Sequence, residues 1–199
     1  MDKSELNKRE IEIYEKYQNI IMPYIMELEV RDVEYPIEIM NEVRAVFTHL
    51  SRYKVQCSEK DLYSAENHIK RAILDCYKYL CISIAESVYR FREEYKKVDL
   101  KLANNGCFLP ELDRLEKEAR NCFERAKKSE TQKLDEEEQY RLFEEAYNAY
   151  SMLEKHIDDS AEAILFASSH SKSSNLINII SCIITLISII VAIVIWIYS

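Results

Sequence analysis

The sequence predicts an all-α protein: an elongated bundle of helices followed by one C-terminal transmembrane helix. The 199 residues include 1 Gly and 3 Pro, whereas average usage would place roughly fourteen Gly in a chain of this length. Sandwiches, barrels, Rossmann folds and P-loops need Gly in their turns, so these classes are excluded. The last charged residue is Lys172, and residues 173–199 carry no charged side chain.

The C-terminal run 176–198 reads LINIISCIITLISIIVAIVIWIY. A helix of about 23 residues extends roughly 35 Å, which is enough to cross a hydrocarbon core. Residues 171–175 form a polar linker before the run, and Trp196 and Tyr198 lie at its far end, where aromatic rings favour the membrane interface. The charged first residues contain no signal peptide. We therefore expect residues 1–170 to form a cytoplasmic domain, held at a bacterial inner membrane by a single span.

Small and polar residues form a stripe along this predicted span. They recur at steps of three or four residues and so share one helix face: Asn178, Ser181, Thr185, Ser188 and Ala192. In lipid, such residues mark surfaces where helices touch or where water enters. The stripe predicts self-association, and a ring of copies would be needed to line a pore. The alternative is that the hydroxyls bond back to carbonyl groups of their own helix.

Apolar periodicity and helix-end signals divide the first 170 residues into five expected helices, at about 4–29, 36–54, 58–103, 110–128 and 131–168. Ser4 is the expected cap of the first helix, and Pro23 is an expected bend within it. Pro36 and Pro110 fit the first positions of the second and fourth helices.

The third helix is the longest expected element. Ser58 and Asp61 form its N-terminal cap. Its apolar residues keep helical steps as far as the only Gly, Gly106: Leu62, Ala65, Ile69, Ile73, Cys76, Leu80, Ile84, Val88, Phe91 and Tyr95. A helix of about 45 residues is unusual for a compact domain. We therefore expect an elongated shape whose sides pack against other copies.

The cysteines and the net charge limit the ligands that the chain can take. The 6 Cys show no C-x-x-C pair and no His at zinc-ligand spacing. We expect them to be reduced core residues, with no structural metal, no disulfide and no cofactor. The Tyr residues of the third helix are expected in the core or in a subunit contact. A formal net charge of -8 argues against a duplex-DNA binder.

One segment contains residues that could catalyse a reaction. Arg44 and His49 form an Arg-x4-His pattern on the second helix, and about 140° of helix separates them. A His could move a proton in RNA cleavage while an Arg holds the phosphate. The alternative is a polar network that sets the register of the second and third helices. Its members would be Arg52, His68, Arg71 and Asp75, with Asp75 or Glu42 balancing the cations.

All-helical domains with Arg-x4-6-His resemble the HEPN superfamily, in which paired copies often act as RNases. Two features depart from the active pattern: Ala45 stands where a polar residue usually follows the Arg, and Arg44 and His49 lie early in the chain. Joined to one transmembrane helix, the motif is similar to the small membrane accessory proteins of type VI-B CRISPR systems. That resemblance implies an antiphage effector that forms a ring in the inner membrane, opens a pore, and enhances defence by an RNA-guided nuclease.

Three functions follow as hypotheses. The first is a homo-oligomeric membrane effector of this kind, in which Arg44 and His49 are structural or gating residues. Its partners would be further copies of itself, the lipid bilayer, and an RNA-guided CRISPR nuclease or its RNA products. The second is a membrane-tethered, metal-independent RNase with His49 as acid and base. The third is a tail-anchored adaptor that brings a partner to the membrane.

Overall fold

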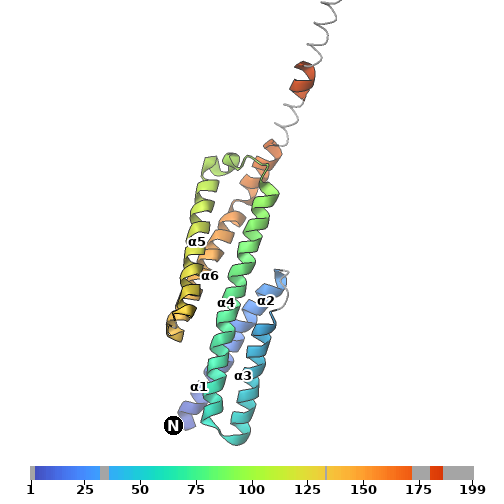
Figure 1. Ribbon diagram of the computed structural model, residues 1–199. Helices are drawn as coiled ribbons and strands as arrows, with labels where there is room; N and C mark the ends of the chain where they lie inside the picture. The colour runs from blue at the N-terminus through green and yellow to red at the C-terminus, as the bar shows by residue number, and fades with distance from the viewer. Residues whose placement is uncertain (1–2, 32–35, 133, 172–179, 186–199) are drawn as a thin grey trace, which may run out of the picture. The chain divides into compact units, whose positions relative to one another are not determined.

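The computed structural model describes residues 3–31, 36–132, 134–171 and 180–185, and within them the protein is all-α (Figure 1). The elements follow in the order α1 Lys3–Lys16, the π-helix η1 Tyr17–Ile21, α2 Met22–Val30, α3 Ile37–Gln56, α4 Glu59–Tyr95, the 3-10 helix η2 Leu100–Gly106, α5 Phe108–Thr131 and α6 Glu136–Asp159. Residues 161–171 and 180–185 are also helical. The chain divides into a first unit, Met1–Tyr89 with Leu115–Glu154, and a second unit, Arg90–Arg114 with Lys155–Ser199.

The first expected helix is interrupted where Pro23 was expected to bend it. Pro23 has no backbone N–H, so the helix cannot keep its regular pattern of bonds at this point. The N–H of Met22 instead donates to the carbonyl of Tyr17, five residues back, which makes residues Tyr17–Ile21 a π-helix. Ser4 lies inside α1 rather than capping it, because α1 begins at Lys3.

Helices α3 and α4 form an antiparallel hairpin (Figure 1). Pro36 is the residue before α3, with an extended ψ of 110°, so the helix begins one residue later than predicted. It ends at Gln56, and the next residue, Cys57, adopts a left-handed φ of 54°. The predicted cap of the next helix is confirmed, because the N–H of Asp61 donates to the Ser58 hydroxyl oxygen at 3.3 Å.

The predicted apolar face of the long helix is confirmed as the core of the first unit. Residues from Leu62 to Val88 on that face are at most 3% exposed, namely Leu62, Ala65, Ile69, Ile73, Cys76, Leu80, Ile84 and Val88.

Phe123 of α5 contacts the rings of Phe143 and Tyr150 of α6. Arg31, at the end of α2, binds Glu27 and Glu154 through its guanidinium at 2.6–3.1 Å.

The long helix ends earlier than predicted. Helix α4 stops at Tyr95, and the N–H of Val98 donates to the Tyr95 carbonyl in a turn. The Asp99 side chain then accepts the Lys101 N–H and starts η2. Asp competes for backbone N–H groups in this way and favours caps over helix interiors. The predicted continuation to residue 103 is therefore wrong.

The predicted helix 131–168 is also broken. Helix α6 runs from Glu136 to Asp159, and Ser160 forms a turn before residues 161–171. The buried Ser160 hydroxyl accepts a hydrogen bond from Asn104 at 2.8 Å, within the second unit. The break therefore coincides with a contact between segments distant in sequence.

The cysteines are only partly core residues. Cys76 and Cys81 are buried, whereas Cys57, Cys107 and Cys182 are exposed. Burial raises the pKa of the Cys76 and Cys81 thiols to about 12, so both stay protonated at neutral pH.

Among the described helices, none combines the length and the apolar composition that a bilayer crossing requires. The predicted span 176–198 lies outside the described residues, except for residues 180–185. Of the predicted polar linker 171–175, residue 171 is described, and it is helical.

Candidate functional site

The two residues of the Arg-x4-His pattern lie on α3 but do not meet. Arg44 is exposed, and it makes no side-chain hydrogen bond or ion pair with any described residue. His49 is half-buried, and its Nδ1 lies 2.8 Å from Oδ1 of Asp61 on α4. The structure therefore pairs His49 with a carboxylate of the neighbouring helix rather than with Arg44.

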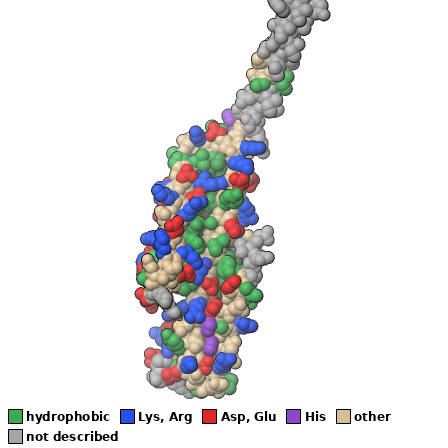
Figure 2. Space-filling view, in the orientation of Figure 1, with side chains coloured by type: hydrophobic (Ala, Val, Ile, Leu, Met, Phe, Trp, Pro, Cys, Tyr) green, Lys and Arg blue, Asp and Glu red, His purple; other side chains and the backbone are tan. Residues whose placement is uncertain are grey.

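A second histidine completes this arrangement. Nδ1 of His68 on α4 lies 2.6 Å from Oε2 of Glu42 on α3. The rings of His49 and His68 stack, with centroids 5.3 Å apart and an angle of 16° between their planes. We call Glu42, His49, Asp61 and His68 the histidine row. Two neighbouring histidines are visible low on the face that Figure 2 shows, over α3 and α4.

The row follows from a repeated spacing on two antiparallel helices. The acid precedes the histidine by seven residues on each helix: Glu42 and His49 on α3, Asp61 and His68 on α4. Seven residues are about two helical turns, so the acid and the histidine of one helix lie on the same face. Because the helices run in opposite directions, each acid meets the histidine of the other helix.

The electrostatics of the row favour a charged Asp61. The hydrogen bond from His49 lowers the pKa of this carboxyl below its ordinary range, and the Ser58 hydroxyl and the nearby Arg52 guanidinium add to the effect. With Nδ1 of each ring on a carboxylate, Nε2 is the nitrogen left for another partner. A histidine oriented in this way can act as a general acid or base, provided that a substrate reaches Nε2.

The residues of the predicted polar network do not form one network: some lie at the histidine row and others do not. His68 belongs to the histidine row, and Arg52 lies close enough to Asp61 to lower its pKa. Arg71 is exposed, and its side chain makes no hydrogen bond or ion pair with any described residue. Asp75 instead binds Lys78 of its own helix at 3.1 Å.

Lys78 forms an ion pair that links α4 to α5. Its ammonium lies 2.7 Å from Glu130 of α5 and 5.2 Å from the centroid of the Phe143 ring. Burial raises the pKa of Asp75, against the opposing effect of the Lys78 charge. The pairing of Lys78 with Glu130 was not predicted, because ion pairs between helices leave no periodic signal in the sequence.

Aromatic side chains from three helices form a tyrosine cluster in the first unit. Tyr77 of α4 is 2% exposed, and its ring lies 5.3–5.6 Å from those of Tyr24, Tyr140 and Tyr147. Burial raises the pKa of Tyr147 to about 12. The expected core position is confirmed for Tyr77, whereas Tyr89 of the same helix is 68% exposed.

The predicted membrane stripe is described only in part. Asn178, Ser188 and Ala192 lie outside the described residues. Ser181 and Thr185 are helical and exposed, and the Thr185 hydroxyl donates to the Ser181 carbonyl at 2.9 Å. This bond within one helix is the alternative that the sequence left open for the stripe.

Comparisons of the chain with protein-family models, with curated proteins and with solved structures find no match. In the part of the chain that the structure describes, no three His, Cys, Asp or Glu residues are grouped so that they could hold a metal ion.

Proposed function

We propose that this protein is a membrane effector: a helical domain anchored by the run 176–198 that assembles as a ring of copies and permeabilises the bilayer. The observation that carries the proposal is the run itself, which contains no charged residue and has the length that a hydrocarbon core requires. The polar stripe supports contact between copies, because small and hydroxylated residues let transmembrane helices approach closely.

The described part of the run supports a helical tail. Residues 180–185 are helical, and Thr185 donates its hydroxyl proton to the Ser181 carbonyl. This hydrogen bond gives the Thr185 hydroxyl an acceptor, and an unpaired hydroxyl donor in lipid would cost free energy. The hydroxyl oxygen of Thr185 still has a lone pair, which can accept a hydrogen bond from another copy.

The biological setting that we propose is the bacterial inner membrane, where the protein enhances antiphage defence alongside an RNA-guided CRISPR nuclease. This setting rests on the resemblance to the small membrane accessory proteins of type VI-B CRISPR systems. The partner nuclease, or the RNA that it releases, would supply the activating signal to the helical domain.

In this proposal the histidine row has a structural role. Both histidines use Nδ1 to bind a carboxylate of the opposite helix, at 2.6 and 2.8 Å. Arg44 does not take part in the row. Contacts of this kind set the register of α3 against α4 and do not require a substrate.

The decisive experiment measures the mass and the conductance of the full-length protein. Native mass spectrometry in mild detergent should give a closed oligomer, and planar bilayers should show channel currents. Replacing Asn178 or Thr185 with Leu should reduce the current because it removes polar groups from the stripe. Ile183→Leu, outside the stripe, is the matched control and should leave the current unchanged.

Two outcomes would contradict the proposal. A monomer without conductance would exclude a pore. Full defence activity after an unrelated membrane span replaces residues 176–198 would favour the tail-anchored adaptor, because an adaptor needs only an anchor.

The contact between His49 and Asp61 favours one second candidate, a membrane-tethered HEPN-type RNase. The carboxylate holds Nδ1, so Nε2 could exchange a proton with an RNA 2′-hydroxyl, while the exposed Arg44 binds phosphate. This candidate predicts RNA cleavage by the full-length protein in the presence of EDTA, abolished in both His49→Ala and Arg44→Ala. The absence of cleavage by concentrated wild-type protein would exclude it.

A further inference from the structure

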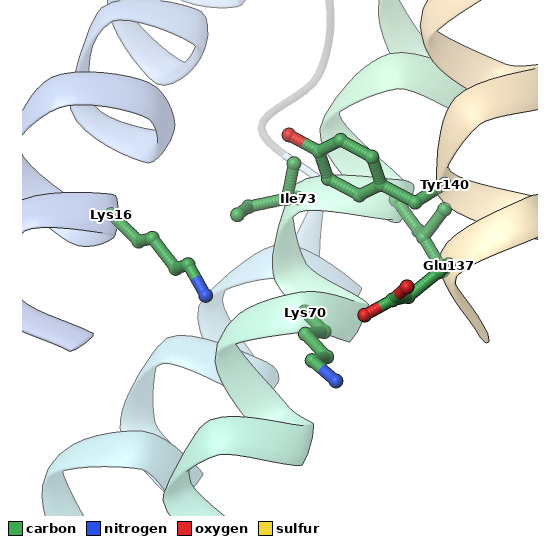
Figure 3. A pocket seen from close by; sticks show the side chains of 6 residues that line it. Lys16, Lys70, Ile73, Glu137 and Tyr140 are labelled. Atoms are coloured by element: carbon green, nitrogen blue, oxygen red, sulfur yellow. The ribbon is translucent and has the colours of Figure 1, made fainter. Parts of the chain in front are cut away.

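The first unit contains a cavity of about 370 Å³ that has no residue of the histidine row in its lining (Figure 3). It is bounded by α1, α4 and α6, and its lining consists of Lys16, Lys70, Ile73, Leu74, Glu137 and Tyr140. Ligand sites in proteins have volumes of about 300–1,000 Å³, and they combine apolar walls with a few polar groups. This cavity has both properties.

The apolar side of the cavity is held in place by the core. Ile73 is 1% exposed, and its neighbour Leu74 is half-buried. The Tyr140 hydroxyl lies 3.4 Å from that of the buried Tyr77, and the two rings meet edge to face at 5.6 Å. These contacts hold the Tyr140 ring before any ligand arrives. Another aromatic ring can therefore pack against it at little entropic cost.

Two groups of opposite charge border the same space. The Lys16 side chain projects toward it from α1, and the Glu137 carboxylate projects toward it from α6 (Figure 3). Neither side chain makes a hydrogen bond or an ion pair with any described residue. Lys70 also lines the cavity, but it already interacts with another group of the protein. Among the described residues of the lining, the charged groups that remain for a ligand are therefore one ammonium and one carboxylate.

Both charged groups come from the ends of their helices. Lys16 is the last residue of α1 and directly precedes the π-helix η1. Single-turn π segments within helices are frequent at functional sites. Glu137 lies in the first turn of α6, whereas the apolar wall comes from the middle of α4. The cavity thus combines a fixed apolar wall with two charged groups at its border.

The combination selects a ligand that carries both charges. A purely apolar ligand would remove water from the ammonium and from the carboxylate without replacing it, which is unfavourable. An anion would bind Lys16 but leave Glu137 desolvated, and a cation would do the reverse. A zwitterion with an apolar side chain satisfies both charged groups and also fills the space beside the apolar wall.

We propose that this cavity binds a free α-amino acid with an aromatic side chain. The carboxylate of the ligand binds the Lys16 ammonium, and its own ammonium binds the Glu137 carboxylate. Hydrogen bonds between two charged groups are stronger than those between neutral groups. The ring of the ligand packs against Tyr140 and Ile73. Membrane insertion is not needed for this binding, so the inference stands apart from the proposed pore.

The experiment titrates full-length protein in mild detergent with phenylalanine, leucine, phenethylamine and 3-phenylpropionate, using calorimetry. Phenethylamine lacks the carboxylate and 3-phenylpropionate lacks the ammonium, so each should bind about tenfold more weakly than phenylalanine. Lys16→Gln should weaken phenylalanine binding about tenfold and leave phenethylamine binding unchanged. Glu137→Gln should weaken phenylalanine binding about tenfold and leave 3-phenylpropionate binding unchanged.

Tyr140 is tested by the choice between phenylalanine and leucine. Tyr140→Leu should remove the preference for phenylalanine, because that preference comes from the contact between two aromatic rings. Tyr140→Phe keeps the ring and should retain phenylalanine binding within about twofold, even if Tyr140→Leu does not fold. Lys60→Gln and Asp158→Asn change exposed charged residues outside the cavity lining, and they should leave phenylalanine binding unchanged.

Three outcomes would overturn the proposal. The first is no binding of phenylalanine at millimolar concentrations. The second is binding of phenethylamine or 3-phenylpropionate as tightly as phenylalanine, because one of the two charges would then be unnecessary. The third is equal binding of phenylalanine by wild type, Lys16→Gln and Glu137→Gln. None of these readouts depends on conductance, so this inference and the pore can fail separately.

Discussion

Four side chains form two pairs between α3 and α4. Glu42 and Asp61 each lie seven residues before a histidine of the same helix, and each binds the histidine of the other helix. A slip of one turn, about 5.4 Å, would break both pairs at once. Apolar contacts tolerate small slips because they are not directional. Paired hydrogen bonds of fixed spacing therefore add specificity to a hairpin that the apolar face already stabilises.

Asp61→Asn should lower the melting temperature of the protein at neutral pH. The His49 hydrogen bond lowers the pKa of Asp61 from its ordinary 3.8. A lowered pKa contributes stability above the unfolded value, and that stability is lost as the pH falls through the folded value. The difference between wild type and variant should thus be largest near pH 7 and shrink below about pH 4.

Circular dichroism melts of the full-length protein in detergent, across this pH range, provide the measurement. Asp158→Asn changes an exposed carboxylate and should leave the melting temperature unchanged at every pH. An Asp61→Asn effect that persists undiminished at pH 3 would show that the charge of Asp61 is not its cause.

Arg31→Ala should destabilise the protein by roughly 2 kcal/mol, because it leaves two partly buried carboxylates without their cation. Glu27 and Glu154 both bind the Arg31 guanidinium, and their side chains are 29% exposed. Arg31→Lys keeps the charge but cannot form the forked contact, so it should show an intermediate loss. Urea unfolding provides the test, and equal stability of Arg31→Ala and wild type would contradict it.

Among the helices, α4 ends although the apolar periodicity of the sequence continues. Apolar steps continue beyond Tyr95, yet the helix stops there, and Asp99 begins a new 3-10 helix. Asn104, Asn105 and Gly106 then take positive φ angles of 50°, 54° and 86°. Asn and Gly adopt this conformation more readily than other residues, so the segment reverses direction here.

Gly106→Ala should cost about 1 kcal/mol, because a side chain disfavours the left-handed region. The cost should come from the backbone alone, since a Cβ at Gly106 would meet only the Lys101 carbonyl oxygen, at an ordinary 3.7 Å. Asn105→Gly should not destabilise the protein by more than a few tenths of a kcal/mol. Thermal melts compare the two variants, and a larger loss in Asn105→Gly would contradict this account.

The predicted helices 58–103 and 131–168 are both interrupted in the structure, and apolar periodicity does not predict either interruption. The apolar face of α4 from Leu62 to Val88 was predictable, because every helical step places an apolar residue on one side. The turn at Ser160 was not predicted; there the Ser160 hydroxyl accepts a hydrogen bond from Asn104, 56 residues away. A local pattern carries no information about such a partner.

At the scale of the whole molecule, the chain combines two compact helical units with a C-terminal run that has no charged residue. The first unit contains the histidine row and a cavity that Lys16, Lys70 and Tyr140 border in part. In the proposed function, the helical domain receives the signal, and the run 176–198 acts on the membrane.

Deletion of residues 172–199 should release the protein from the membrane fraction. The run supplies the apolar length for a span, whereas residues 1–171 carry all the charged side chains except Lys172. Full-length protein should resist extraction with alkaline carbonate, while the truncated chain should remain in the supernatant. Retention of the truncated chain in the pellet would mean that the helical domain binds the membrane by itself.

The sequence alone determined the all-α class, the long apolar face of α4, the cap at Ser58 and the charge-free run, since all depend on residues close together in the chain. Only the tertiary structure decided that His49 meets Asp61 rather than Arg44, and that Tyr140, Lys16 and Lys70 border one cavity. Helix periodicity tells which face of a helix is apolar, but not which helix faces it. The partners of polar side chains depend on which helix lies opposite them.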